Sequence, residues 1–274
     1  MNITSKTQVL AVVGNPVRHS LSPKLHNYLS HKLELDYVYT AFEPDSFDDV
    51  SKAIKTLGIK GINVTAPFKY KAYECVDELD EEARLCGSVN TIVNTGGVLK
   101  GYSTDGEGLY MSMKLNNIDV EGRTVLLLGA GGAAKPVCVM LKRRGAKAVI
   151  IKNRTESKSV SLCDDLNKSM NTDIFSVYKD QKKWDIIINT TSVGLGTDEN
   201  PLTDNTFYKC AQVAVDLIYH PAKTSFLSLA EENGLKILNG AGMLVFQGVL
   251  AYEYFTGVKV PENIYEEVLE LIYE

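Results

Sequence analysis

Residues 124–134 read TVLLLGAGGAA, an apolar run that leads into a glycine-rich turn. The turn matches the pattern GxGxxG/A at Gly129, Gly131 and Ala134. In this pattern the first glycine permits a tight turn, the second lets the backbone approach a pyrophosphate, and the third small residue allows close helix packing. The stretch predicts a strand, a turn and a helix N-terminus that binds phosphate, although such a turn can also be purely structural.

The strand that follows predicts which dinucleotide is bound. NAD sites usually carry Asp or Glu about 20 residues further on, where the acid holds the ribose 2′-hydroxyl. Here the expected strand 148–152 is followed by Asn153, Arg154 and Thr155, with Lys158 one turn later. A guanidinium fork suits a phosphate, and cations at a helix N-terminus oppose the helix dipole, which disfavours a merely solvated basic helix start. The pattern predicts NADP.

Short apolar runs alternate with helical patterns through the rest of the chain. From Asp105 onward the strands are separated by helices, which implies βαβ units and a parallel sheet, and in the first half the turn at residues 95–97 predicts a hairpin. The expected strands are 8–13, 37–42, 61–65, 89–94, 98–101, 124–128, 148–152, 174–177, 185–189, 212–217 and 236–238.

Two helix starts are predicted from capping residues. One is Ser22 as N-cap with Pro23 after it, and the other is Asp45, whose helix ends at Gly58. The other expected helices cover 71–86 with a break near Asp77, 105–116, the stretch from the glycine turn to 144, the stretch from the end of the strand 148–152 to about 170, 224–233, 240–257 and 262–273.

Length and composition bound the class of protein. A chain of 274 residues with 45% apolar and 23% charged residues predicts about two globular domains. A net charge of −5 without a basic run argues against nucleic-acid and membrane-surface partners. Five cysteines without a CxxC pair predict free thiols in a reducing cytoplasm, and the four histidines show no metal-ligand spacing. No run approaches the roughly 18 apolar residues of a membrane span.

Polar residues follow several of the expected strands in the first half. In open α/β sheets ligands bind beyond the carboxyl ends of strands, so these polar loops can converge on one site. Each also has a structural interpretation: Ser22 and Asp105 as helix caps, Asn90 as a turn residue and Lys69 as a surface lysine. The segments are 19–23 (HSLSP), 63–69 (NVTAPFK), 87–91 (GSVNT) and 103–106 (STDG).

Taken together, these segments resemble the shikimate dehydrogenase family over nearly the whole chain. Nine segments follow the family's order and spacing, which is far more specific than any single motif. They read GNPVRHSLSP, GINVTAPFK, GSVNT, STDG, GAGGAAK, NRT, INTTSVG, VDLIY and GAGMLVFQG.

The resemblance implies a role for each matching residue. Lys69 and Asp105 are the implied catalytic pair, and Ser20 and Ser22 would hold the substrate carboxylate. The ring hydroxyls would be bound by Thr65, Asn90 and Gln247, with Tyr219 beside them. The implied cofactor site comprises Gly129, Ala130, Gly131, Gly132, Ala133, Asn153, Arg154, Thr155 and Lys158, with Thr191, Leu217 and Gly240 at the nicotinamide end.

Two positions depart from this pattern, and a third matches it without an evident role. The family usually has Asn where Ser103 precedes the Thr-Asp-Gly segment, so a hydroxyl replaces an amide there. The acid often found before Gly240 is Asn239 here. Glu81 matches a position linked to the cofactor but has no evident physical role. Neither change, at Ser103 or at Asn239, touches the catalytic pair.

The implied reaction is the reversible NADPH-dependent reduction of 3-dehydroshikimate to shikimate, a step of chorismate and aromatic amino-acid biosynthesis. Transferring a hydride to or from a secondary alcohol requires a group that moves the hydroxyl proton, and Lys or Asp can do this. The expected fold is α/β. Residues 1–104 with 240–274 would form the substrate-binding domain and residues 105–239 a Rossmann-like NADP-binding domain, with the site in the cleft. No metal is expected, and both a monomer and a homodimer are compatible.

Two alternatives stay open at this point. A quinate or shikimate dehydrogenase of the same family that uses NAD is disfavoured by Arg154 and Lys158. A non-catalytic NADP-binding regulator on the same fold is disfavoured because both Lys69 and Asp105 are retained.

Overall fold

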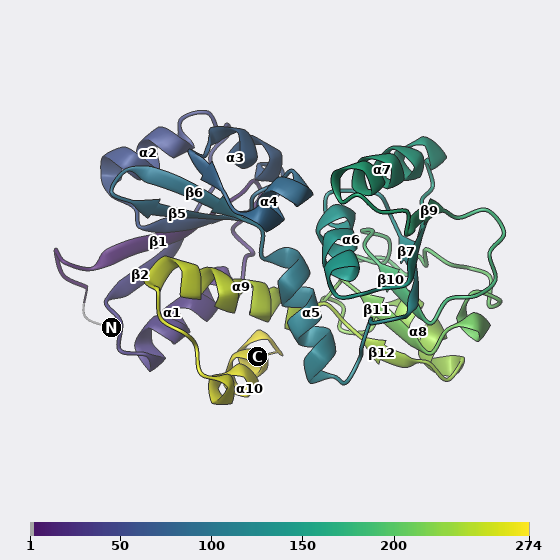
Figure 1. Ribbon diagram of the computed structural model, residues 1–274. Helices are drawn as coiled ribbons and strands as arrows, with labels where there is room; N and C mark the ends of the chain where they lie inside the picture. The colour runs from purple at the N-terminus through teal and green to yellow at the C-terminus, as the bar shows by residue number, and fades with distance from the viewer. Residues whose placement is uncertain (1–2, 274) are drawn as a thin grey trace. The chain divides into compact units, whose positions relative to one another are not determined.

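The computed structural model describes residues 3–273, which divide into two compact units (Figure 1). The first unit contains the chain up to Thr104 and again from Val245 onward. The second unit runs from Asp105 to Leu244. The chain therefore enters the second unit at a helix start and leaves it inside the long helix α9 (Ala241–Thr256).

A mixed sheet forms the centre of the first unit. Its described strands follow the order β2-β1-β3-β5-β6-β4. The strand β1 is parallel to β2 and β3, whereas β5 is antiparallel to both β3 and β6. The expected hairpin is confirmed, and it makes the sheet of this unit mixed rather than purely parallel. The strands are β1 (Gln8–Val13), β2 (Tyr37–Phe42), β3 (Gly61–Val64), β4 (Glu78–Leu79), β5 (Thr91–Thr95) and β6 (Val98–Tyr102).

Helices cover both faces of this sheet, with α2 and α3 on one face and α1 and α9 on the other (Figure 1). Two buried clusters correspond to these faces, one with residues of α1, α9 and α10 and one with residues of α2, α3 and α4. The helices of this unit are α1 (Ser22–Lys32), α2 (Val50–Leu57), α3 (Lys69–Cys75), α4 (Glu81–Cys86), the part of α9 from Val245 and α10 (Tyr265–Tyr273), with a 3₁₀ turn at Glu262–Ile264.

Both helix caps predicted for this region are wrong. Ser22 is already the first residue of α1, and Leu21 occupies the N-cap without a side-chain hydrogen bond. The helix assigned to Asp45 begins five residues later at Val50, because Ser46 and Asp48 form a local turn instead. The predicted end at Gly58 is confirmed, since this residue adopts a left-handed φ of 65° that glycine tolerates best.

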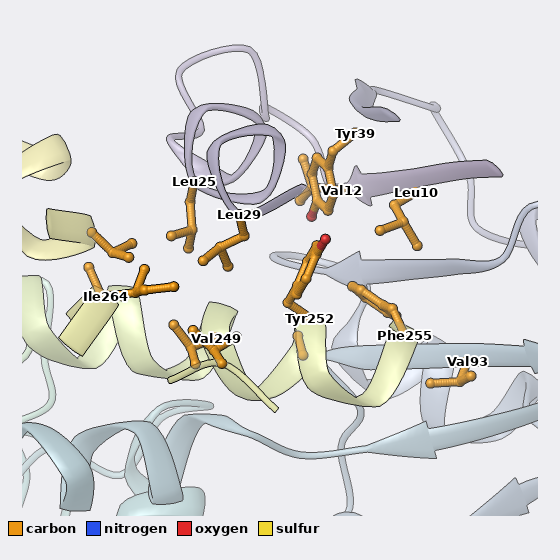
Figure 2. Close-up of a cluster of buried hydrophobic side chains, with 14 of the residues drawn as sticks. Leu10, Val12, Leu25, Leu29, Tyr39, Val93, Val249, Tyr252, Phe255 and Ile264 are labelled. Carbon is orange, nitrogen blue, oxygen red and sulfur yellow. The ribbon is translucent and has the colours of Figure 1, made fainter. Parts of the chain in front are cut away.

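The core beneath α9 is rich in aromatic side chains (Figure 2). Tyr252 and Phe255 of α9 are buried with Tyr39 of β2, and the His26 ring stacks on Tyr39 with 4.1 Å between centroids. Burial lowers the pKa of His26 to about 3, so its imidazole is neutral. Gly248 of α9 lets this helix approach α1, because a Cβ at this position would lie 2.4 Å from Leu25 Cδ2.

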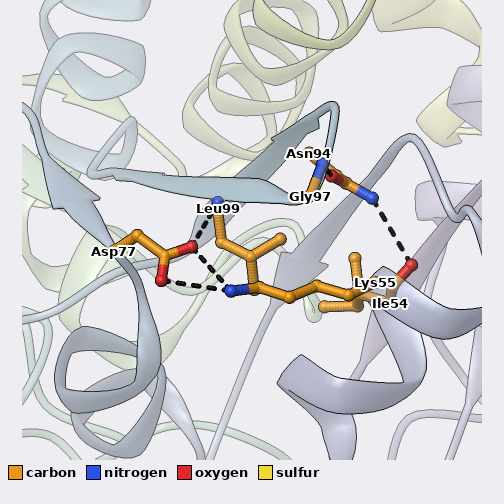
Figure 3. A network of polar contacts seen from close by, with 6 residues as sticks. All are labelled: Ile54, Lys55, Asp77, Asn94, Gly97 and Leu99. Carbon is orange, nitrogen blue, oxygen red and sulfur yellow. Dashed lines mark hydrogen bonds and ion pairs between the residues drawn. The ribbon is translucent and has the colours of Figure 1, made fainter.

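A polar network ties α2 to the hairpin (Figure 3). Asp77 accepts hydrogen bonds from Lys55 Nζ at 2.8 Å and from the backbone N–H of Leu99 at 2.7 Å. Asn94 donates to the carbonyl of Ile54 at 3.4 Å and accepts from the N–H of Gly97 at 2.9 Å. The predicted break near Asp77 is confirmed, and the short strand β4 that fills it was not predicted.

The second unit contains a parallel sheet. Its described strands follow the order β12-β11-β10-β7-β8-β9, and every pair of neighbours is parallel. The strand order reverses between β7 and β10, which makes a doubly wound, Rossmann-like sheet with its switch point there. The strands are β7 (Thr124–Leu128), β8 (Ala148–Lys152), β9 (Phe175–Val177), β10 (Ile186–Asn189), β11 (Val213–Asp216) and β12 (Lys236–Leu238).

The central strands β7, β8 and β10 are nearly continuous apolar runs, as expected when helices cover both faces of a sheet. Among the described residues, four helices lie entirely within this unit. They are α5 (Asp105–Leu115), α6 (Ala134–Arg143), α7 (Glu156–Ser169) and α8 (Ser225–Glu232), with a 3₁₀ turn at Tyr208–Cys210. Within residues 3–273 no helix is long and apolar enough to cross a membrane.

Candidate active site

A cavity of about 260 Å³ lies at the carboxyl ends of β7, β8 and β10. This is the switch point of the sheet, where doubly wound folds bind their ligands. Most of the predicted cofactor residues line it, and Gly132, Ala133, Leu217 and Gly240 do not. The lining residues are Gly129, Ala130, Gly131, Asn153, Arg154, Thr155, Lys158, Thr190, Thr191 and Ser192.

The glycine turn has the geometry that the pattern predicts. Gly129 adopts a φ of 107°, and a Cβ at this position would meet Thr190 Oγ1 at 2.7 Å and Thr191 Cγ2 at 2.9 Å. At Gly131 nothing lies within 4 Å of a built Cβ, so its backbone is open to the cavity. Ala134 begins α6 and is fully buried, as the close-packing role requires.

The loop after β8 supplies the positive charge of this cavity. Arg154 and Lys158 are exposed and both line it, with Lys158 in the first turn of α7. The amide of Asn153 donates to the carbonyl of Thr155 at 2.9 Å, which holds the loop ahead of the helix. Two cations on the adenosine side of a Rossmann site can contact a ribose 2′-phosphate.

The predicted residues of the nicotinamide end follow β10, β11 and β12. Thr191 lines the cavity, together with Thr190 and Ser192, which were not predicted. Leu217 and Gly240 lie against each other instead, because a Cβ on Gly240 would come within 2.0 Å of the Leu217 carbonyl oxygen. A run of three hydroxyl residues directly after an apolar strand was the sequence signal that could have identified Thr190 and Ser192.

The first unit gathers its predicted substrate residues at one edge of the mixed sheet. Ser20 and Ser22 follow β1, and Thr65 and Lys69 follow the parallel neighbour β3. Asn90 precedes the antiparallel strand β5, so it starts at the edge where β3 ends. Backbone hydrogen bonds link the loops, from the N–H of Thr65 to Val13, of Val64 to Asn90 and of Val89 to Lys69.

The amide of Asn90 is buried and already oriented. Its Nδ2 donates to Thr104 Oγ1 at 2.9 Å, and its Oδ1 accepts from the Thr104 N–H at 2.9 Å. Thr91 Oγ1 donates to the same Oδ1 and accepts from Asn63 Nδ2, each at 3.1 Å. The Tyr39 hydroxyl donates to Asn63 Oδ1 at 2.7 Å. Polar residues inside the apolar strands GINV and TIVNT were the signal that could have identified Asn63 and Thr91.

The other predicted site residues have these positions. Asp105 is the first residue of α5, directly after Thr104, and its side chain is buried. Gln247 lies on the part of α9 that belongs to the first unit, and Tyr219 follows β11 in the second. Glu81 is the exposed first residue of α4, next to Asp80, whose carboxylate caps the helix at the N–H of Ala83.

The fold and the cavity define a class: an α/β protein with a dinucleotide site at the switch point of a doubly wound sheet. Three family models cover most of the chain. The shikimate dehydrogenase substrate binding domain matches residues 12–92, shikimate / quinate 5-dehydrogenase matches residues 111–209, and the shikimate 5′-dehydrogenase C-terminal domain matches residues 240–270.

Curated relatives and solved structures agree with these models. The shikimate dehydrogenase (NADP(+)) of Alkaliphilus metalliredigens is 40% identical over 279 residues, covering 97% of this chain and 98% of the relative. Shikimate 5-dehydrogenase of Listeria monocytogenes in complex with shikimate and NAD superposes with a TM-score of 0.90 at 33% identity, covering 98% of each chain. The Thermus thermophilus enzyme, in complex with NADP(H) and shikimate, gives 0.86 at 31% identity, covering 96% of this chain and 98% of that one. The chain belongs to the shikimate dehydrogenase family.

Proposed function

We propose that this chain catalyses the reaction of its family, the reversible NADPH-dependent reduction of 3-dehydroshikimate to shikimate. The observation that carries the proposal is the switch-point cavity, which combines the Gly129–Gly131 turn with Arg154 and Lys158 in a member of this family. It supports an NADP-dependent oxidoreductase acting on a CH–OH group. A reducing cytoplasm is part of the proposal, and five free cysteines among the described residues are compatible with it.

Lys69 and Asp105 are the proposed acid–base pair. When bound, NADPH supplies the hydride for the substrate carbonyl carbon. The Lys69 ammonium then gives a proton to the developing alkoxide, and the Asp105 carboxylate shares a hydrogen bond with the alcohol and orients Lys69. In the reverse direction the same pair removes the hydroxyl proton.

The remaining residues bind and orient the two ligands in this proposal. Ser20 and Ser22 hold the substrate carboxylate, and Thr65, Asn90 and Gln247 bind the ring hydroxyls beside Tyr219. Arg154 and Lys158 would hold the 2′-phosphate of the cofactor, with Asn153 and Thr155 in the same loop. The backbone of the glycine turn would hold the pyrophosphate. Residues implied for these contacts at the turn and the nicotinamide end are Gly129, Ala130, Gly131, Gly132, Ala133, Thr191, Leu217 and Gly240.

An absorbance assay tests the proposal directly. Purified protein is incubated with shikimate or quinate, each with NADP⁺ or NAD⁺, and reduced nicotinamide is followed. We expect turnover with shikimate and NADP⁺. Preference for NAD⁺ would favour the other candidate within the family, for which the NAD bound to the Listeria structure is the specific observation. NADP⁺ binding without any turnover would favour a regulator and contradict the proposed function.

A further inference from the structure

Thr91 is a buried polar residue of the first unit that the proposed mechanism does not use. It is the first residue of β5 and pairs with Asn63 across the antiparallel strand β3. Its side chain is 0% exposed, so the hydroxyl cannot reach a bound substrate directly. It can act on a ligand only through a neighbour, and the residue before it is Asn90, a proposed ligand of the ring hydroxyls.

Asn63 determines the direction of the hydrogen bonds at Thr91. Its Nδ2 lies 3.4 Å from the backbone carbonyl oxygen of Asn90, which can only accept, so the nitrogen end of the amide faces this way. The same Nδ2 lies 3.1 Å from Thr91 Oγ1 and donates to it. At the other end of the amide, the Tyr39 hydroxyl donates to Asn63 Oδ1 at 2.7 Å. Thr91 therefore accepts on the Asn63 side, and its single hydroxyl proton is directed elsewhere.

That proton is donated to the side chain of Asn90, whose Oδ1 lies 3.1 Å from Thr91 Oγ1. A backbone N–H can only donate, and the N–H of Thr104 lies 2.9 Å from the same oxygen, so Oδ1 is the end of the amide that faces both threonines. The nitrogen end donates to the Thr104 hydroxyl at 2.9 Å. Every donor from Tyr39 to Asn90 points the same way, and Thr91 is the link between the two amides.

We propose that Thr91 is a positioning residue for the substrate: its hydroxyl holds the Asn90 amide in the orientation that binds a ring hydroxyl. The inference rests on the proposed role of Asn90 and deepens it. The terminal torsion of an asparagine side chain rotates broadly, so its amide keeps one orientation only when its partners fix it. Loss of the Thr91 hydroxyl would release the amide on the β3 side. Shikimate would then have to order the amide as it binds, which weakens binding.

Two substitutions at position 91 separate the hydroxyl from the packing of the side chain. Thr91→Val keeps the volume and removes the donor, whereas Thr91→Ser keeps the donor and removes a methyl group. Titration calorimetry measures the Kd values for shikimate and NADP⁺. We expect Thr91→Val to bind shikimate about 3- to 10-fold more weakly, within the range of one neutral hydrogen bond, and Thr91→Ser to stay within about 2-fold of the wild type. The Kd for NADP⁺ should change by less than about 2-fold, because the cofactor cavity is lined by residues of the second unit.

A double-mutant cycle tests whether Thr91 acts through Asn90. In an Asn90→Ala background the amide is gone, so Thr91→Val has nothing left to release. We expect the shikimate Kd of the double variant to match that of Asn90→Ala within about 2-fold. If Thr91→Val does not fold, Thr91→Ala compared with Thr91→Ser isolates the same hydroxyl. The matched control is Ser30→Ala, which removes another buried hydroxyl of the first unit, bonded to the carbonyl of His26 at 3.0 Å, and should change neither Kd.

Four outcomes would overturn the inference: unchanged shikimate binding in Thr91→Val, weaker binding in Thr91→Ser than in Thr91→Val, equal losses for shikimate and NADP⁺, or additive losses in the double variant. Each leaves the proposed function standing if the wild type oxidises shikimate with NADP⁺. A wild type that binds shikimate, with the expected order among the variants, but does not oxidise it would contradict the proposed function alone, because the order is measured by binding.

Discussion

The two units present their polar residues in opposite ways. In the second unit the exposed cations Arg154 and Lys158 lie on the loop after β8 and in the first turn of α7, and the glycine turn offers backbone N–H groups. In the first unit Asn90 is only 4% exposed, and its amide is held by neighbouring hydroxyl and backbone groups. An exposed cation attracts a phosphate at long range but is screened by salt, whereas a buried, oriented amide selects a neutral hydroxyl by geometry. The difference predicts that the two units respond differently to salt and to substitution.

The largest expected effect is that of Lys69→Met, which removes the proposed proton donor and keeps most of the side-chain volume. Turnover should fall by about 10²- to 10⁴-fold, the range of general acid–base catalysis, with a modest change in the KM for shikimate. Steady-state kinetics and a thermal melt measure the two effects separately. The matched control is Lys71→Met on the same helix, where the ammonium pairs with Glu74 at 3.3 Å. Near-wild-type turnover in the Lys69 variant would remove this residue from the mechanism.

The exposed cations of the second unit are tested by Arg154→Ala. Loss of a charge-assisted hydrogen-bond set of roughly 1.5–3 kcal/mol corresponds to a KM for NADP⁺ about 10- to 150-fold higher. The KM for NAD⁺ should change little, because NAD has no 2′-phosphate. Arg123→Ala, beyond the amino end of β7, is the control, since its guanidinium lies near Asp185 instead.

Salt sharpens the same prediction. Raising the ionic strength should reduce the preference of the wild type for NADP⁺ over NAD⁺, because an exposed cation–phosphate pair is screened. The variant should show a smaller salt effect than the wild type. If Arg154→Ala weakened both cofactors equally, the guanidinium would support the loop or stack on adenine, and the proposed 2′-phosphate contact would lose its main physical support.

The carboxylate end of the proposed substrate site is tested by Ser20→Ala. We expect the KM for shikimate to rise by about 10-fold, the lower end for one hydrogen bond to a charged group. Ser20 Oγ also accepts from the N–H of Ser22 at 3.2 Å, so the substitution removes a local backbone contact as well. Ser46→Ala removes the same kind of contact to the N–H of Asp48 at 3.2 Å, in an exposed turn. An equal change in both variants would place the carboxylate elsewhere.

Sequence reasoning predicted the doubly wound sheet well because its signals are local. Continuous apolar strands, a glycine turn at Gly129 and the basic loop after β8 each specify their own geometry within a few residues. The cavity then follows from the strand order. The N-caps predicted at Ser22 and Asp45 were wrong for the converse reason. A hydroxyl or carboxylate near a helix start has several local partners, and the choice among them depends on the turn that forms.

The hydrogen-bond networks could not be predicted in the same way. Asn63, Thr91 and Asn90 are linked across β3 and β5, and Asn189 is linked to Asp216 across β10 and β11. Each link depends on the register between strands that are distant in sequence. Single polar residues in apolar strands mark where such a network starts, and only the register identifies the partner.

The smallest expected effect concerns the surface tie between α2 and the hairpin in the first unit. Asp77→Asn should lower the free energy of unfolding by about 0.5–1 kcal/mol, a range that allows for solvent screening because the side chains of Lys55 and Asp77 are 39% and 43% exposed. The N–H of Leu99 and the ammonium of Lys55 lower the pKa of Asp77 from its ordinary 3.8. A lowered pKa means that the contribution is present above pH 3.8 and is lost as the pH falls through the folded-state value.

Denaturant unfolding at several pH values measures this effect. The stability difference between wild type and Asp77→Asn should be constant near neutrality. It should shrink as the pH falls from 3.8, where the unfolded chain takes up a proton, through the lower pKa of the folded protein. Lys55→Met removes the ion pair but keeps the hydrogen bond from the Leu99 N–H to Asp77. We therefore expect it to lose less stability than Asp77→Asn. Both variants should keep the wild-type KM values, since neither side chain belongs to the proposed sites. A changed KM for shikimate would mean that the loop at Asn90 depends on this tie, and the buried network of the first unit would then be less self-contained than its hydrogen bonds indicate.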